Sequence, residues 1–184
     1  MRKVITSINI TLDGFCDHTA VIADQELHQD ANDLFVDADI LILGRITYEL
    51  MRSGWAPIVQ KPTGQKAMDE FAVLIENIDK VVFSRSLKTA GWKNARIKNS
   101  DLQEEVTKLK KQDGRNIFVG GPSLIIQLMN LDLIDEYRFC VQPIILGSGM
   151  PLFKNIKDRI NLRLTGTKVL GSGAVTLIYE RNNN

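Results

Sequence analysis

The sequence predicts an α/β fold with a mostly parallel central sheet and antiparallel strands near its C-terminus. Short apolar runs alternate with amphipathic stretches of helical period over residues 4–131. One of these runs, residues 38–44, is apolar on both faces, which is typical of a buried parallel strand. Two strand-like runs flank the turn at residues 171–173 and predict a hairpin. No linker-like stretch interrupts the chain, so we expect one domain, residues 1–184.

The first strand, residues 4–12, has one apolar and one polar face, with Ile8, Ile10 and Leu12 on the first and Ser7, Asn9 and Thr11 on the second. A polar face this close to the core indicates a pocket wall. A half-solvated edge strand explains the alternation equally well.

Helices and strands alternate after this strand. The spacing of Leu27, Ala31, Leu34 and Phe35 predicts a helix over residues 24–35, before the strand 38–44. A short helix at 47–52 should lead into a loop that contains Trp55, Pro57, Pro62 and Gly64. We then expect a helix near 65–75 and a strand at 80–84.

The second half continues this alternation. An amphipathic helix is expected over 101–111, with Ser100 as its N-cap. A strand at 116–121 is followed by a helix at 122–131 with Pro122 in its first turn. The chain should end with a long strand over 135–147 and the hairpin over 161–182.

Composition and charge exclude several classes of protein. A net charge of +1, with basic residues scattered among acids, makes nucleic acid a poor partner. Neither a signal-peptide apolar region nor a membrane-spanning stretch is apparent, so we expect a cytoplasmic protein without membrane contact. The two cysteines, Cys16 and Cys140, and the two histidines, His18 and His28, lack metal-ligand spacing. We therefore expect no metal site.

Common catalytic motifs are missing. The sequence contains no GxSxG, no GxxxxGK[ST] and no GxGxxG, so acyl transfer and nucleotide hydrolysis lose support. Hydride transfer remains possible, because its chemistry resides in a cofactor that the protein only has to bind and orient.

Three expected strand ends share one character: Gly44-Arg45, Ser84-Arg85-Ser86 and Gly120-Gly121-Pro122-Ser123. Ligands of open α/β sheets bind at the carboxyl ends of strands. The backbone N–H groups of Arg45, Ile46 and Thr47 could hold a pyrophosphate at a helix start, with help from the Thr47 hydroxyl. Alternatively, Thr47 caps its own helix.

The two arginines and the glycine pair extend this hypothesis. Arg45 and Arg85 could grip a further phosphate, such as the ribose phosphate that distinguishes NADP from NAD, or could be ordinary surface residues. Gly120 and Gly121 would let a ligand approach the main chain, although a tight turn without a ligand explains them too.

In their order and spacing, the motifs resemble the dihydrofolate-reductase-like superfamily, especially the C-terminal reductase domain of the bifunctional riboflavin-biosynthesis protein. The motifs are SINITLDG (7–14), ILILGRITYE (40–49), VVFSRS (81–86), IFVGGPSLI (117–125) and LIDEYRFCVQPIILGSGMPLF (133–153). The resemblance implies a three-layer α/β/α sandwich, NADPH as cofactor, and a homodimer that associates through the terminal hairpin and the strand around Phe139.

The resemblance also assigns cofactor residues. It implies that Gly44, Arg45 and Thr47 bind the NADPH phosphates and that Ser84 and Arg85 lie near the adenosine ribose phosphate. Gly120, Gly121, Ser123 and Leu124 would line the central part of the cofactor. By the same likeness we expect a cis peptide bond between Gly120 and Gly121.

The substrate is less constrained. Dihydrofolate reductases carry a carboxylate on the first helix, where this sequence has His28, with Asp24, Glu26 and Asp30 nearby. Folate reduction is therefore disfavoured. His28 and Asp13 are the candidate catalytic residues, although Asp13 could simply form its turn. Asn9 and Gln142 are candidates for binding a heterocycle through their amides.

The resemblance thus predicts an NADPH-dependent reductase of a small pyrimidine- or pteridine-like molecule. It would be similar to the 5-amino-6-(5-phosphoribosylamino)uracil reductase of riboflavin biosynthesis, without the zinc deaminase signature of the bifunctional protein. The alternatives are a dihydrofolate reductase and a non-catalytic NADP-binding protein.

Overall fold

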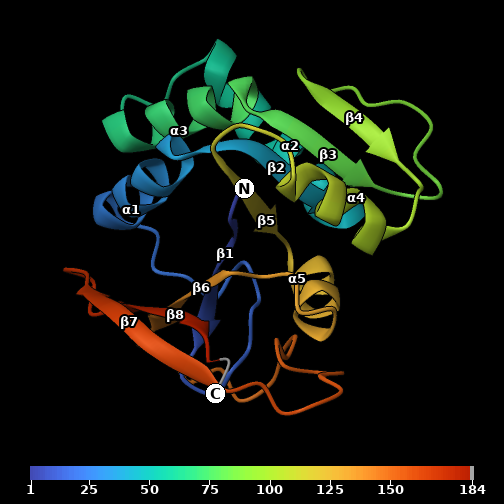
Figure 1. The fold of residues 1–184 in the computed structure, drawn as a ribbon. Coiled ribbons are helices and arrows are strands. Elements are labelled where there is room, and N and C mark those ends of the chain that lie inside the picture. Colours follow the sequence, from blue (N-terminus) through green and yellow to red (C-terminus); the bar gives the residue numbers. More distant parts are fainter. Residues whose placement is uncertain (183–184) are drawn as a thin grey trace.

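Eight strands form one sheet, in the order β4-β3-β2-β5-β1-β6-β8-β7, in the computed structural model, which describes residues 1–182 (Figure 1). The strands are β1 (Val4–Thr11), β2 (Ala38–Gly44), β3 (Asp79–Phe83), β4 (Ala95–Lys98), β5 (Asn116–Gly120), β6 (Glu136–Gln142), β7 (Leu162–Val169) and β8 (Val175–Arg181). The helices are α1 (Gln25–Val36), α2 (Arg45–Gln60), α3 (Lys66–Asn77), α4 (Leu102–Lys110) and α5 (Pro122–Asn130).

The sheet is parallel from β4 to β6, and β8 and β7 add to it in the antiparallel sense. The turn between β7 and β8 is closed by hydrogen bonds between Leu170 and Ala174 and between Gly173 and Leu170. The predicted α/β class, with a mostly parallel sheet and antiparallel C-terminal strands, is therefore confirmed.

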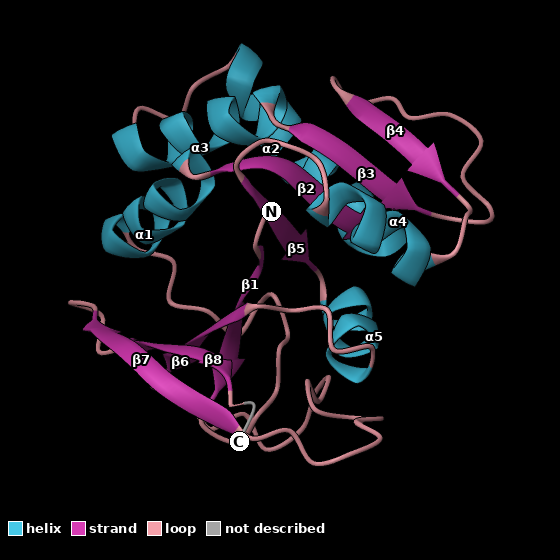
Figure 2. Ribbon diagram, in the orientation of Figure 1, coloured by secondary structure: helices cyan, strands magenta, loops and turns pink. Residues whose placement is uncertain are grey.

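Helices cover both faces of the sheet and bury two separate apolar cores (Figure 2). The alternation along β2 shows the division, because Ile40 and Ile42 face the core under α4 and α5, whereas Leu41 and Leu43 face the core under α1, α2 and α3. This arrangement is the three-layer sandwich that the resemblance implies.

Strand β1 lies inside the sheet, between β5 and β6. The edge-strand alternative for residues 4–12 is therefore excluded. Ile5 packs in the core beneath α1, and Ser7 and Asn9, two and four residues further along the same face, are half-buried. The polar face of β1 is thus turned toward the side of the sheet that α1 covers.

Helix α2 is much longer than the short helix expected at 47–52. It continues through Trp55 and Pro57 to Gln60, so the expectation of a loop at those two residues is wrong. The Trp55 ring packs edge-on against Phe71 of α3, with 4.7 Å between ring centroids. This burial favours continuing the helix, and Pro57 lies in its last turns, where one missing N–H costs least.

Three smaller differences concern the second half of the chain. The N-cap of α4 is Asp101, whose Oδ1 accepts from the Glu104 N–H at 3.0 Å, and not Ser100. Strand β6 ends at Gln142, because Pro143 has no N–H to give to the ladder. Strand β4 was not expected at all, since it has four residues and no fully buried side chain.

A buried lysine fixes the start of β4. Lys80 Nζ donates to the carbonyl oxygens of Glu76, Ile78 and Lys93 at 3.1, 3.0 and 3.0 Å, and lies 4.6 Å from the centroid of the Trp92 ring. Burial lowers the pKa of Lys80 to about 8. The three bonds hold the end of α3 to the segment that leads into β4.

The search for membrane-spanning segments covered the described part of the chain. None of the helices there combines the length and the apolar character needed to cross a bilayer.

Candidate functional site

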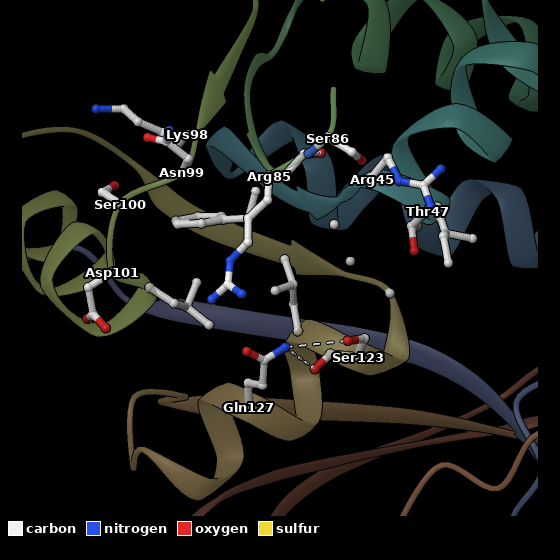
Figure 3. A pocket seen from close by; sticks show the side chains of 18 residues that line it. Arg45, Thr47, Arg85, Ser86, Lys98, Asn99, Ser100, Asp101, Ser123 and Gln127 are labelled. Atoms are coloured by element: carbon white, nitrogen blue, oxygen red, sulfur yellow. Dashed lines mark hydrogen bonds between the residues drawn. The ribbon is translucent and has the colours of Figure 1, made fainter. Parts of the chain in front are cut away.

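A cavity of about 560 Å³ lies where the carboxyl ends of β2, β3 and β5 meet (Figure 3). It brings together residues that are far apart in the sequence. All nine residues proposed above for cofactor binding line it: Gly44, Arg45, Thr47, Ser84, Arg85, Gly120, Gly121, Ser123 and Leu124. The three strand ends that looked alike in the sequence thus enclose one space.

Two helices begin at this cavity without a side-chain cap. The N-cap of α2 is Gly44 and that of α5 is Gly121, and neither helix start has a side-chain hydrogen bond. By contrast, α1 and α4 are capped by the carboxylates of Asp24 and Asp101. Thr47 does not cap α2, so that alternative is excluded. The first-turn N–H groups of α2 and α5 therefore remain available to an anion.

Gly121 allows the turn from β5 to pack closely against α2. Its φ of +92° lies in the region that favours glycine, and a Cβ atom at this position would collide with the Thr47 hydroxyl. A Cβ at Gly120 would lie 2.9 Å from Leu43 Cδ2. The glycine pair thus brings two strand ends into contact at the cavity floor.

The peptide bond between Gly120 and Gly121 is trans, and no cis bond occurs in residues 1–182. The expectation of a cis bond is therefore wrong. The positive φ of Gly121 turns the chain into α5 instead.

The two arginines of the cavity differ in how they are engaged. Arg45 Nη1 pairs with Glu49 Oε2 at 2.9 Å, one helical turn along α2. Within residues 1–182, Arg85 pairs with no carboxylate, and its guanidinium group extends across the cavity toward α5 (Figure 3). Arg85 is therefore the cation with free capacity for a ligand.

The Ser84 hydroxyl has a local role as well. It accepts from the N–H groups of Ser86 and Leu87 at 3.3 and 2.9 Å, which shapes the turn that carries Arg85. Its own O–H remains able to donate.

The sequence interpretation missed one wall of the cavity. The segment from the end of β4 to the start of α4 contributes Lys98, Asn99, Ser100, Asp101 and Leu102. Lys98 pairs with Glu105 of α4 at 3.1 Å. Its strand is short and half-exposed, so hydrophobic periodicity gave no signal. Ile46, Phe83, Ser86 and Gln127 complete the lining.

Asp13, a candidate catalytic acid, is used inside its own loop. Its carboxylate accepts from the Thr11 hydroxyl at 2.6 Å and from the N–H groups of Leu146 and Gly147 at 3.1 and 2.7 Å. These bonds, with that from Thr11 the largest cause, lower the pKa of Asp13 to about 2. The group is ionised at neutral pH and cannot donate a proton there, which favours the turn-forming alternative.

Gln142 and Asn9 are joined to each other. Gln142 is fully buried, and its Oε1 accepts from the Ile22 N–H at 3.1 Å while its Nε2 donates to Asn9 Oδ1 at 2.9 Å. Gln142 therefore cannot reach a ligand directly. Asn9, which is half-buried, keeps a free amide nitrogen.

His28 lies apart from the nine residues. Its Nδ1 is 2.8 Å from the Asp24 carbonyl oxygen, and its ring meets the edge of the Trp55 ring. It lines a second cavity of about 350 Å³ that shares no residue with the first and is formed by Gln25, His28, Gly64, Gln65, Lys66, Ala67 and Met68. The structure thus gives His28 no contact with the large cavity.

The described residues contain no group of three or more potential metal ligands. What the large cavity offers is unpaired N–H groups, one free arginine and a closely approachable backbone, which suits an extended, phosphorylated ligand.

Comparisons with known proteins identify the family. The family model described as RibD C-terminal domain matches residues 2–176. The uncharacterized protein YyaP of Bacillus subtilis (strain 168) is 34% identical over 185 residues, which cover 98% of this chain and 96% of that protein.

Solved structures agree with the fold. A pyrimidine reductase-like protein from Corynebacterium diphtheriae superposes with a TM-score of 0.70 at 16% identity, over 100% of this chain and 93% of that one. Dihydrofolate reductase from Enterococcus faecalis, complexed with NADP(H), gives a TM-score of 0.62 at 15% identity, over 98% and 97% of the two chains. The chain therefore belongs to the RibD C-terminal domain family, a family of reductases with a dihydrofolate-reductase-like fold.

Proposed function

We propose that this protein is an NADPH-dependent reductase whose substrate is a small pyrimidine- or pteridine-like ring. One observation carries the proposal: all nine residues suggested by the sequence line a single cavity that offers two uncapped helix N-termini and an unpaired arginine. Family membership supports it, since this is a family of reductases that typically bind NADP(H).

The residues of the cavity fit the parts of such a cofactor. The N–H groups at the starts of α2 and α5 would hold the pyrophosphate, because unpaired N–H groups and the helix dipole favour negative charge. The guanidinium of Arg85 would grip the additional ribose phosphate in a charge-assisted pair. Gly121 would let the cofactor lie against the main chain.

The bound cofactor would supply a hydride, and the chain would bind and orient the acceptor ring beside it. We place that ring near the polar face of β1, where Ser7 and Asn9 are half-buried. The proton that completes the reduction would come from solvent, since Asp13 is ionised and bound within its loop.

The test is a fluorescence titration of the protein with NADPH and with NADH. We expect tighter binding of NADPH, and a loss of that preference in Arg85→Ala. Arg159→Ala, which removes an arginine outside the cavity, serves as the matched control. If neither cofactor binds at millimolar concentration, the proposal fails.

Activity is then measured as NADPH oxidation over a panel of oxidised pyrimidines and pteridines that includes dihydrofolate. Turnover of dihydrofolate would favour a dihydrofolate reductase. Tight NADPH binding without oxidation of any ring would favour a non-catalytic NADP-binding protein.

We also propose that the protein forms a homodimer through the terminal hairpin. Strand β7 is an edge of the sheet, and Leu164 and Val169 on it are exposed apolar residues. Sedimentation velocity should show a species of twice the 20.7 kDa chain mass. Val169→Glu should shift this species toward the monomer, whereas Val73→Glu, at an exposed apolar residue on α3, should not. A monomer at working concentration would contradict the proposal.

A further inference from the structure

The half-buried polar face of β1 lies beside the end of β5. Thr6 is paired with Val119 in the parallel register, so the next residue of each strand, Ser7 and Gly120, should also lie side by side. Asn9 is two residues further along β1. With a strand spacing of about 4.8 Å and a rise of about 3.3 Å per residue, Asn9 Cα lies roughly 8 Å from Gly120. That distance is within the reach of a single ring placed against Gly121.

The orientation of the Asn9 side chain is set by a short relay of hydrogen bonds. The backbone N–H of Ile22 can only donate, so the Gln142 atom that faces it at 3.1 Å must be the carbonyl Oε1. The NH₂ group of Gln142 consequently faces Asn9 at 2.9 Å and requires the Asn9 oxygen there. Gln142 is fully buried, so this arrangement is shielded from water.

The relay leaves Asn9 with one free group. Its Oδ1 is occupied by Gln142, and within residues 1–182 its Nδ2 has no hydrogen-bond acceptor. Asn9 therefore presents two N–H donors and no acceptor on the side of the sheet that faces α1. A half-buried donor gains most from a ligand atom that can only accept.

We infer that Asn9 recognises a carbonyl oxygen or an unprotonated nitrogen on the ring of the substrate, and that Gln142 is the positioning residue that fixes Asn9 as a donor. The inference rests on the proposed reductase function and specifies its substrate, which carries an acceptor at this position. A ring with an amino group there would set donor against donor and lose affinity.

The test uses two rings of similar shape and opposite hydrogen-bonding character. Uracil presents carbonyl oxygens, and 2,4-diaminopyrimidine presents amino groups. Both are titrated by calorimetry at mildly alkaline pH, where both are uncharged, with and without saturating NADPH. Wild-type protein should prefer uracil on the order of 10-fold.

Two variants separate recognition from general stability. Asn9→Asp has nearly the same shape but presents an oxygen in place of the NH₂, so the preference should reverse toward diaminopyrimidine. Gln142→Met leaves Asn9 in place but removes the relay, so Asn9 can turn and the preference should fall toward one. Asn77→Asp, on the exposed end of α3, is the matched control and should keep the wild-type preference.

NADPH affinity is measured separately for each variant and should stay within about 2-fold, because Asn9 and Gln142 do not line the cofactor cavity. Failure of wild-type protein to bind NADPH would count against the proposed function. The inference about Asn9 is overturned if wild-type protein prefers diaminopyrimidine, if it binds neither ring, or if Asn9→Asp leaves the preference unchanged.

Discussion

The polar residues at the ends of β2, β3 and β5 differ from those at the ends of β1 and β6 in how far their hydrogen-bonding groups are already used. At the first set of strand ends, Arg85 has no carboxylate partner and two helix starts have no side-chain cap. At the second set, the Asp13 carboxylate accepts three bonds and both polar atoms of the Gln142 amide are occupied.

This difference separates residues that can hold a ligand from residues that hold the chain together. A polar group that is already satisfied offers little to a ligand, because binding would only exchange one partner for another. A group that is left open near the core has been desolvated without compensation, and a ligand can supply what is missing. The comparison therefore predicts large effects of substitution at the open end and mainly structural effects at the satisfied end.

The largest expected effect comes from Gly121→Val, which closes the open end. The new side chain would collide with the Thr47 hydroxyl and would have to adopt a positive φ. We expect a loss of NADPH affinity of about 100-fold or more and a destabilisation of roughly 2 kcal/mol. Fluorescence titration and chemical denaturation measure the two effects.

The matched control for this substitution is Gly54→Ala inside α2, where a Cβ would meet nothing within 4 Å. It should stabilise the protein by up to about 1 kcal/mol through helix propensity and leave NADPH binding unchanged. Wild-type affinity in Gly121→Val would show that the contact between the glycine turn and α2 is irrelevant to the cofactor.

The next prediction compares the open arginine with the paired one. Arg85→Ala should weaken NADPH binding by roughly 30-fold and NADH binding little, because a charge-assisted pair to the extra phosphate is lost. Arg45→Ala should weaken NADPH more than NADH, but only by a few-fold, since Glu49 already engages the Arg45 guanidinium. Both are measured in parallel titrations. Equal losses of NADPH and NADH in Arg45→Ala would mean that it only grips the shared pyrophosphate.

Much of the fold could be predicted from the sequence, because hydrophobic periodicity reports directly on burial. The run at 38–44 is apolar on both faces, and β2 is indeed covered on both sides. Periodicity failed where burial is slight, as in β4, and where a long-range contact decides, as in the packing of Trp55 on Phe71 that extends α2.

The candidate cofactor site could be located for a related reason. Strand ends are marked in the sequence by glycine and polar residues that follow an apolar run, and parallel strands bring those ends to one edge. The state of Asp13 and Gln142 could not be predicted. Their partners Leu146 and Ile22 are more than 100 residues away, and no local pattern reports such a contact.

The smallest expected effect tests the satisfied end through pH. The pKa of Asp13 is lowered to about 2 from its ordinary value of 3.8. Its contribution to stability should therefore be complete above about pH 4 and be lost as the pH falls toward 2, because protonation releases the bonds to Thr11 and Gly147. Asp13→Asn should show a smaller loss of thermal stability between pH 5 and pH 2 than wild-type protein.

Asp33→Asn is the control, since Asp33 lies exposed on α1 with only Gln29 bonded to it, and it should follow the wild-type profile. Activity provides the sharper discrimination. If Asp13 only holds its loop, Asp13→Asn should keep the shape of the wild-type pH profile of NADPH oxidation, because a group with a pKa near 2 carries no proton to donate in the neutral range. An ionisation between pH 5 and 8 that disappears in Asp13→Asn would return this residue to the chemistry and break the distinction between open and satisfied groups.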